Sequence, residues 1–183
     1  RGDAVGVMAW NTPRHMEVWY GVTGAGCILH TLNPRLFAEQ LDYIINHARD
    51  RAILFDADML PIFEALKPKL PLVERYIILC DRAQMPANTL DAICYEDWLA
   101  EQDGDFAWVD GEERDPCGLC YTSGTTGNPK GVLYEHRSNV LHALYSLHPN
   151  CITMDSNDLI YPVVPLFHAN GWGLAYTTPM SGA

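Results

Sequence analysis

The sequence predicts an α/β fold in which a layered, mainly parallel sheet is flanked by helices. Short apolar runs recur along the chain, and several are continuous rather than alternating, which is typical of strands buried on both faces of a parallel sheet. Segments with helical spacing of apolar residues lie between these runs, so strand and helix alternate through at least the first half. The 183 residues suffice for one sizeable domain or for part of a larger one.

Seven runs of the chain are typical of strands. They are short, rich in apolar residues and separated by polar or glycine-containing segments. In chain order, the predicted strands span residues 4–10, 27–32, 52–56, 75–80, 118–122, 132–136 and 159–164.

The first two predicted helices follow the first two strands. One begins at Thr12 and Pro13, an N-cap residue followed by a first-turn proline, and ends near Gly24 and Gly26. Its helical spacing is carried by Met16, Trp19, Tyr20 and Thr23. The next helix lies within 35–50, and its apolar stripe is formed by Phe37, Leu41, Ile44, Ile45 and Ala48.

Two more helices are predicted further along the chain. A short one lies within 59–68 and is stopped by Pro68. Another lies within 138–148, with Ser138 as a possible N-cap. Its shared apolar face is expected to consist of Val140, Leu144 and Leu147.

Composition excludes two classes of function. The apolar runs are far shorter than the roughly 18 residues that a membrane-spanning helix needs. The formal net charge of -11 argues against an electrostatic nucleic-acid surface, although a few placed donors can still hold a nucleotide. Acidic residues concentrate in 101–115, which we interpret as a solvated excursion between core elements.

The six cysteines favour a reducing compartment, and we therefore expect a cytoplasmic protein. Most of them lie in apolar stretches, where a free thiol packs as a small hydrophobe. Cys117 and Cys120 form one CxxC pair, but no second ligand pair stands at zinc-site spacing. The CxxC also precedes what looks like a strand end, whereas a redox pair is usually placed at a helix start. Buried, reduced cysteines are the expectation, with a redox or zinc protein as the alternative.

The stretch YTSGTTGNPKG at 121–131 combines the groups that a phosphate loop requires. Gly124, Gly127 and Gly131 allow backbone N–H groups to converge, and Lys130 adds a positive charge. Short hydroxyl donors come from Ser123, Thr125 and Thr126. A flexible hairpin turn is the alternative, but it would not call for hydroxyls, glycines and a lysine together.

This loop differs from the P-loop of nucleotide hydrolases. Pro129 precedes the lysine, glycine rather than serine or threonine follows it, and the next residues read as a strand. The loop is therefore expected to hold phosphate through amides, hydroxyls and Lys130, without a helix dipole.

YTSGTTGNPKG closely resembles the phosphate loop of the adenylate-forming superfamily, which includes acyl-CoA synthetases, luciferases and nonribosomal peptide adenylation domains. PLFHANGWG at 165–173 resembles the next motif of that family, which lines the acyl pocket. The segment MAWNTPRHMEVWYGVTGAGCILHTLNPRL is similar to the fatty-acyl and methylthioalkanoyl branch of the acyl-CoA synthetases. The resemblance covers essentially the whole chain, and it implies part of the large N-terminal domain of an adenylate-forming enzyme.

The resemblance also implies a reaction. The complete enzyme would join a medium- or long-chain fatty acid, or a similar apolar acid, to ATP and then transfer the acyl group to coenzyme A, with Mg²⁺ sharing the phosphate charge. Thr125 would contact the magnesium ion, and Lys130 would be a loop cation rather than the catalytic lysine of the family. The β- and γ-phosphates would be held by Thr122, Ser123, Gly124, Thr125, Thr126, Gly127 and Lys130.

In the second motif, the resemblance places His168 beside the acyl-adenylate as a catalytic residue. Trp172 would gate the acyl tunnel, and Gly171 would leave room for an apolar chain. From the residues alone, His168 and Trp172 could equally be core side chains. A structural role is expected for the other histidines, which are His15, His30, His47, His136, His142 and His148.

The chain begins with Arg1 and lacks the family's AMP-contacting, hinge and C-terminal lysine motifs. We therefore expect residues 1–183 to be a fragment of a single N-terminal AMP-binding domain, without the C-terminal domain and inactive by itself. Two alternatives stay open: an adenylation domain that loads an aryl or amino acid onto a carrier protein, and a non-catalytic nucleotide-binding module. The resemblance is compatible with peripheral membrane association and with a homodimer.

Overall fold

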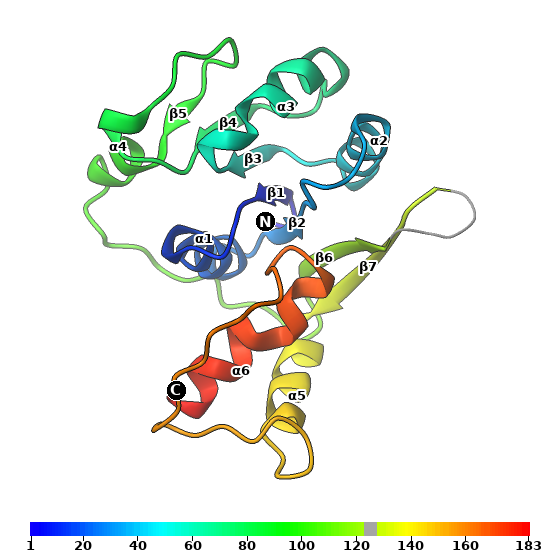
Figure 1. Cartoon of the computed structure of the whole chain (residues 1–183), viewed down its shortest axis with the longest axis vertical. Coiled ribbons are helices and arrows are strands. Elements are labelled where there is room, and N and C mark those ends of the chain that lie inside the picture. The colour runs from blue at the N-terminus through cyan, green and yellow to red at the C-terminus, as the bar shows by residue number, and fades with distance from the viewer. Residues whose placement is uncertain (123–127) are drawn as a thin grey trace.

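The computed structural model describes residues 1–122 and 128–183, and over these ranges it contains a seven-stranded sheet. The strand order is β5-β4-β3-β1-β2-β6-β7 (Figure 1). All neighbouring strands pair in parallel except β6 and β7, which form an antiparallel hairpin. The strands are β1 (Ala4–Met8), β2 (Ile28–Thr31), β3 (Ala52–Phe55), β4 (Arg75–Ile78), β5 (Ile93–Cys94), β6 (Pro116–Thr122) and β7 (Lys130–Glu135). The predicted α/β class is confirmed.

Helices connect the parallel strands, and two of them follow the hairpin. The α-helices are α1 (Pro13–Gly24), α2 (Ala38–Ala48), α3 (Leu60–Leu66), α4 (Tyr95–Ala100), α5 (His136–Ser146) and α6 (Leu174–Ser181). Single turns of 3₁₀-helix are η1 (Ala57–Met59), η2 (Lys67–Lys69), η3 (Arg82–Gln84) and η4 (Ala169–Gly173).

The sheet separates two apolar cores, because successive side chains of a strand point to opposite faces. Met8 of β1 packs in the core under α2 and α3, together with Ile44 and Phe63. Its neighbour Val7 packs in the other core, under α1 and α6, with Trp19. Both faces of the central strands are therefore buried, which explains their continuous apolar sequence.

The start of α1 is formed as the sequence predicts. The Thr12 hydroxyl oxygen accepts a hydrogen bond from the His15 N–H at 3.3 Å, and Pro13 occupies the first helical position, where its missing N–H costs nothing. Trp19 and Thr23 are buried. Tyr20 is 38% exposed, and its hydroxyl donates to the carbonyl oxygen of Ala175 at 2.6 Å.

The apolar stripe predicted for α2 is only partly buried. Leu41, Ile44 and Ile45 are buried, but Phe37 precedes the helix as its N-cap and is 76% exposed. The predicted stripe therefore begins one position too early, because Phe37 lies outside the helix. The helix ends at Arg49 in the left-handed conformation, with φ 61°.

The prediction for α5 was wrong in two respects. The helix begins at His136 rather than at Ser138, whose hydroxyl accepts the Glu135 N–H at 3.1 Å and donates to the Glu135 carbonyl at 2.8 Å. Its buried residues are Ala143 and Ser146, whereas the predicted apolar face is exposed at Val140 and Leu144. Periodicity identifies an apolar stripe, but burial also requires a partner, and α6 packs against the other side.

The strand predicted at 159–164 is not formed. Pro162 has no N–H to donate to a ladder, and Leu159 and Tyr161 are 96% and 85% exposed. Instead, the Asn11 amide donates to the carbonyl oxygens of Pro162 and Val164, at 3.1 and 3.0 Å.

No described helix is long and apolar enough to cross a membrane. Residues 101–113 are exposed, which confirms a solvated segment over most of the predicted range. All six cysteines are free thiols. Four are buried, whereas Cys27 is half-buried and Cys151 is exposed.

Candidate functional site

The open end of the β6–β7 hairpin carries the two described ends of the predicted phosphate loop. Thr122 is the last residue of β6 and Lys130 is the first residue of β7, and the two are direct partners across the hairpin. The Thr122 hydroxyl donates to the Lys130 carbonyl oxygen at 3.5 Å, and both side chains are exposed. The other predicted phosphate-binding residues, Ser123, Gly124, Thr125, Thr126 and Gly127, lie outside the described residues.

A strand, not a helix, follows the loop. β7 begins at Lys130, and α5 begins only at His136. The predicted difference from a P-loop is thus confirmed, since no helix dipole can act at the hairpin end. A positive charge at this end comes from Lys130.

The second motif forms a tight turn with left-handed backbone. The His168 N–H donates to the Pro165 carbonyl at 3.0 Å, and the Gly171 N–H donates to the His168 carbonyl at 2.9 Å. Asn170, Gly171 and Trp172 then follow with φ values of 47°, 59° and 56°. Two of these residues carry a Cβ, and each is expected to cost about 1–2 kcal/mol in this region. Such local strain often occurs at binding sites.

The turn is buried on its inner side and exposed on its outer side. Gly171 is buried, and a Cβ added there would lie 2.8 Å from Leu166 Cδ2. His168 is exposed, and Trp172 is 61% exposed. Glycine at 171 is therefore required by packing and backbone conformation, while the roles of all three residues at an acyl pocket stay predictions.

The turn is fixed to the body of the sheet by two asparagines. The Asn11 side chain, just after β1, accepts the Leu166 N–H at 2.8 Å in addition to its bonds with the preceding carbonyls. The Thr31 hydroxyl at the end of β2 donates to the Asn170 Oδ1 atom at 3.2 Å. Beyond it, Asn170 Nδ2 lies 3.4 Å from the position that a Cβ of Gly118 would take.

The hairpin end and the turn share one face of the sheet. Gly118 of β6 faces Asn170, and side chains two and four residues further along a strand point to the same face. Thr122 therefore points to the face that carries the turn, and its cross-strand partner Lys130 does so as well. Along the strand, Thr122 lies four residues beyond Gly118, or about 13 Å.

The opposite face of β2 and β6 carries a buried ionisable pair that sequence reasoning missed. His30 Nδ1 lies 3.0 and 2.8 Å from the two carboxylate oxygens of Asp50, and both side chains are fully buried. Burial raises the pKa of the Asp50 carboxyl, and His30 beside it opposes the shift. The His30 ring packs against Tyr121, with 5.1 Å between ring centroids.

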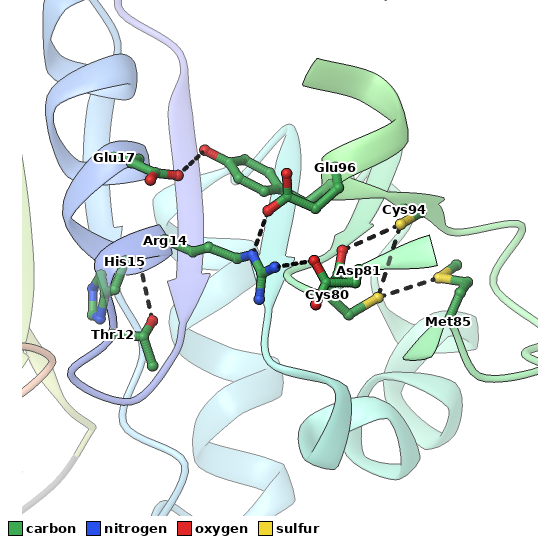
Figure 2. Close-up of polar contacts among 10 residues, drawn as sticks. Thr12, Arg14, His15, Glu17, Cys80, Asp81, Met85, Cys94 and Glu96 are labelled. Carbon is green, nitrogen blue, oxygen red and sulfur yellow. Dashed lines mark hydrogen bonds and ion pairs between the residues drawn. The ribbon is translucent and has the colours of Figure 1, made fainter. Parts of the chain in front are cut away.

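A second polar cluster lies at the far end of the sheet, where β4 and β5 end. Figure 2 shows the Arg14 guanidinium between two carboxylates, Asp81 and Glu96, each at 2.7 Å. The hydrogen bond with Glu96 is the main cause of a raised pKa of Arg14. This cluster joins α1 to the β4–β5 edge, and it is a surface ion-pair group of modest energetic value.

Burial raises the pKa of two of the buried thiols, Cys80 and Cys117. Burial and the neighbouring Cys94 thiol raise the pKa of Cys80 to about 12, and Figure 2 shows the sulfur atoms of Cys80, Cys94 and Met85 together. Burial raises the pKa of Cys117 to about 11, although Asn139 opposes it. A reactive thiol requires the opposite shift. Within 1–122 and 128–183, no three His, Cys, Asp or Glu side chains are grouped to hold a metal ion. The described residues thus offer no observation that favours the redox or the zinc alternative.

Residues 1–183 match the family model described as AMP-binding enzyme. The chain is 51% identical, over 98% of its length, to a 3-methylmercaptopropionyl-CoA ligase of Ruegeria pomeroyi. It is 46% identical, over 99% of its length, to a medium-chain-fatty-acid–CoA ligase of Ectopseudomonas oleovorans. The crystal structure of the anthranilate CoA ligase AuaEII with anthranoyl-AMP covers 100% of the chain, with a TM-score of 0.89 and 25% identity. The chain spans about a third of these proteins, 33% of both relatives and 34% of the solved chain.

Proposed function

The chain belongs to the AMP-binding enzyme family, and from this membership we propose that it is a segment of an ATP-dependent acid–CoA ligase. The complete protein would activate a medium- or long-chain fatty acid, or a similar apolar acid, as acyl-AMP with release of pyrophosphate. It would then pass the acyl group to the thiol of coenzyme A. A CoA-ligase activity is named in both curated relatives, which supports this reaction class.

The observation that carries the proposal is the shared face of the hairpin end and the turn. Lys130 and Thr122 offer a cation and a hydroxyl at one end of this face, and the 168–172 turn offers an imidazole and an indole at the other. A phosphate chain held at the first end would leave the α-phosphorus pointing toward the second. An acid bound near the turn could then attack in line, which is a reaction controlled by positioning and charge neutralisation.

In this arrangement, Lys130 would neutralise phosphate charge, and the Thr122 hydroxyl would donate to a phosphate oxygen. Further donors would come from the loop residues 123–127. Magnesium would lower the electrostatic cost of bringing the carboxylate to the phosphates. The described residues fit a role beside the metal rather than as its complete ligand set, since they bring no three grouped carboxylate, imidazole or thiolate ligands. Thr125 is proposed as the hydroxyl that contacts it.

At the turn, His168 is proposed to lie beside the acyl-phosphate, where its ring N–H could donate to an oxygen that gains charge. Trp172 would cover the apolar part of the acid, and Gly171 keeps the backbone in the conformation that presents both side chains. The free thiols support a reducing compartment such as the cytoplasm.

The aryl-acid alternative is retained for one reason. One of the solved structures that cover the whole chain is an anthranilate CoA ligase, although others that cover it equally are titled long-chain-fatty-acid CoA ligases. An adenylation domain for a carrier protein and a non-catalytic nucleotide-binding module have no comparable support. A test of substrate class must therefore include aryl acids beside fatty acids.

The direct experiment is ATP–pyrophosphate exchange by the complete protein. Acids of graded chain length, 3-methylmercaptopropionate, anthranilate and a panel of amino acids would be compared. We expect exchange with apolar acids, followed by acyl-CoA formation when coenzyme A is added. Exchange with none of these acids would exclude the ligase assignment, and exchange with amino acids alone would favour a carrier-loading domain.

Lys130→Ala tests the phosphate end of the site. The loss of a charged hydrogen bond to phosphate should lower kcat/KM for ATP roughly 10- to 100-fold. The melting temperature should change little, because the Lys130 side chain is exposed. Lys69→Ala removes another exposed lysine outside the site and serves as the control. Equal activity of the two variants would contradict the proposed role of Lys130.

A further inference from the structure

Four polar side chains on the face opposite the proposed ATP site are not used by the proposed function. They form a connected group, which we call the Tyr121 clamp: Asp50, His30, Tyr121 and His47. Asp50 holds the His30 imidazole, whose ring packs against the ring of Tyr121. The Tyr121 hydroxyl meets His47 Nδ1 at 2.6 Å. The clamp thus runs from the fully buried Asp50 to the exposed His47 on α2.

Stability alone does not account for the buried part of the clamp. Taking a carboxylate and an imidazole out of water carries a desolvation cost that their attraction need not exceed. His30 Nε2 is buried without a hydrogen-bond partner among the described residues, which adds to that cost. The neighbouring strand β1 leaves room for the pair, because it has a glycine at position 6. A Cβ at this position would lie 3.0 Å from Asp50 Oδ2. An apolar side chain would fill the same space at lower cost.

Tyr121 connects the buried pair to the hairpin end. It is the direct cross-strand partner of Gly131, and its ring covers that glycine: a Cβ there would lie 3.1 Å from Tyr121 Cζ. The next rung of the ladder is the pair of Thr122 and Lys130. A glycine beside a loop leaves the strand free to twist, and an aromatic ring packed over it removes that freedom.

The hydrogen bond of the Tyr121 hydroxyl restricts the orientation of the ring. Burial, together with the Asp50 charge, raises the pKa of Tyr121 to about 12, so the hydroxyl stays protonated at neutral pH. It can therefore donate to His47 Nδ1 from one side while His30 packs against the ring from another. His47 is itself stacked on Tyr43, with 5.3 Å between ring centroids. The ring has contacts in three directions and little freedom to rotate.

We propose that the Tyr121 clamp holds the last two rungs of the β6–β7 hairpin and so positions Thr122 and Lys130 for the phosphates of ATP. The inference rests on the proposed function. Because Tyr121 points away from the face that carries Thr122 and Lys130, the clamp residues touch neither ATP nor the acid. They are positioning residues, and their effect should appear in ATP affinity rather than in affinity for the acid.

The test is Tyr121→Phe in the complete protein. This change removes one hydroxyl and leaves the ring on His30 and Gly131, so the hairpin should still fold. The Kd for ATP, measured by isothermal titration, and the KM for ATP in pyrophosphate exchange should each rise about three- to tenfold. The KM for the acid should not change.

Tyr95→Phe is the matched control. It also removes one tyrosine hydroxyl with one side-chain partner, Glu17 at 3.1 Å, but at the far end of the sheet. We expect it to change the melting temperature as much as Tyr121→Phe while leaving ATP affinity unchanged. His47→Ala should weaken ATP binding at least as much as Tyr121→Phe, because it removes the same hydrogen bond together with the ring contacts of His47, and the double variant should weaken it no more than His47→Ala alone.

The outcomes separate the two proposals. An unchanged ATP affinity in Tyr121→Phe, or an equal loss in Tyr95→Phe, would overturn the clamp even if the wild type is an active ligase. Weaker ATP binding in Tyr121→Phe would support the clamp even if no acid supports exchange, in which case only the ligase assignment fails. A wild-type protein that binds no ATP would overturn both.

Discussion

His15 should make the stability of the fold depend on pH. Its ring is fully buried on the inner face of α1, and Nδ1 lies 3.0 Å from the carbonyl oxygen of Trp10. Burial lowers the pKa of His15 to about 4, although carbonyl oxygens of Trp10 and Ala9 oppose the shift. The perturbation we propose is His15→Asn, because the asparagine amide can keep a donor toward Trp10 while removing the titrating group.

The sign and size of the effect follow from the two pKa values. The pKa of an unfolded histidine is about 6.5. Between that value and the folded pKa of about 4, the unfolded chain binds more protons than the folded one, so stability falls as the pH falls. Lowering the pH from 7 to 5 should therefore remove roughly 2 kcal/mol of unfolding free energy through this one group.

Urea unfolding at pH 7 and pH 5 would measure this term. Other groups titrate in both proteins, so the quantity of interest is the wild-type loss minus the loss in His15→Asn. We expect the variant to lose about 2 kcal/mol less than the wild type between the two pH values. Equal losses would show that the buried ring does not titrate as burial requires, and the reasoning would be refuted.

Two further predictions concern left-handed residues. Gly171→Ala should lower the unfolding free energy by roughly 2–4 kcal/mol in the same urea assay, because of the positive φ and the contact with Leu166. The control is Gly21→Ala on α1, where a Cβ would meet open space, and it should be neutral or stabilising. Arg49→Gly should raise the unfolding free energy by up to about 1 kcal/mol, and with it the thermal midpoint. The reason is that glycine carries no penalty at φ 61°. Arg49→Ala removes the same charge but keeps the penalty, so a gain in that variant would assign the effect to charge.

The sequence located the strands well where both faces are buried. Strands β1 to β4 lie within the predicted ranges because short runs of apolar residues that are buried on both faces favour strands of a parallel sheet, even though His30 and Thr31 interrupt the run in β2. The short β5 could not be predicted, since the two residues of Ile93–Cys94 carry no periodicity and owe their conformation to pairing with β4. The run at 159–164 has the composition of a strand, but its proline and its lack of a pairing partner in the described sheet prevent one.

The two motifs were also recognisable from sequence, but their relation was not. Their common face depends on the placement of β2 beside β6, although three other strands intervene in the sequence. The Asn11 and Thr31 contacts likewise join distant segments through single polar atoms, and local sequence patterns cannot predict such contacts. His30 could have been suspected as a polar interruption of an apolar stretch, but Asp50 stands between two arginines, where nothing in the sequence indicates burial.

His30 and Thr31 are consecutive in β2, and they leave the sheet on opposite sides, one toward the hairpin tyrosine and the other toward the 168–173 turn. This arrangement gives a rule for building chimeras with relatives. A transplanted acyl-pocket segment should bring its own residue 31, whereas residue 30 should stay with the hairpin of the recipient. A single crossover between residues 30 and 31 would separate His30 from Tyr121, because the hairpin and the turn both follow residue 31 in the sequence, so residue 31 has to be exchanged by itself together with the turn.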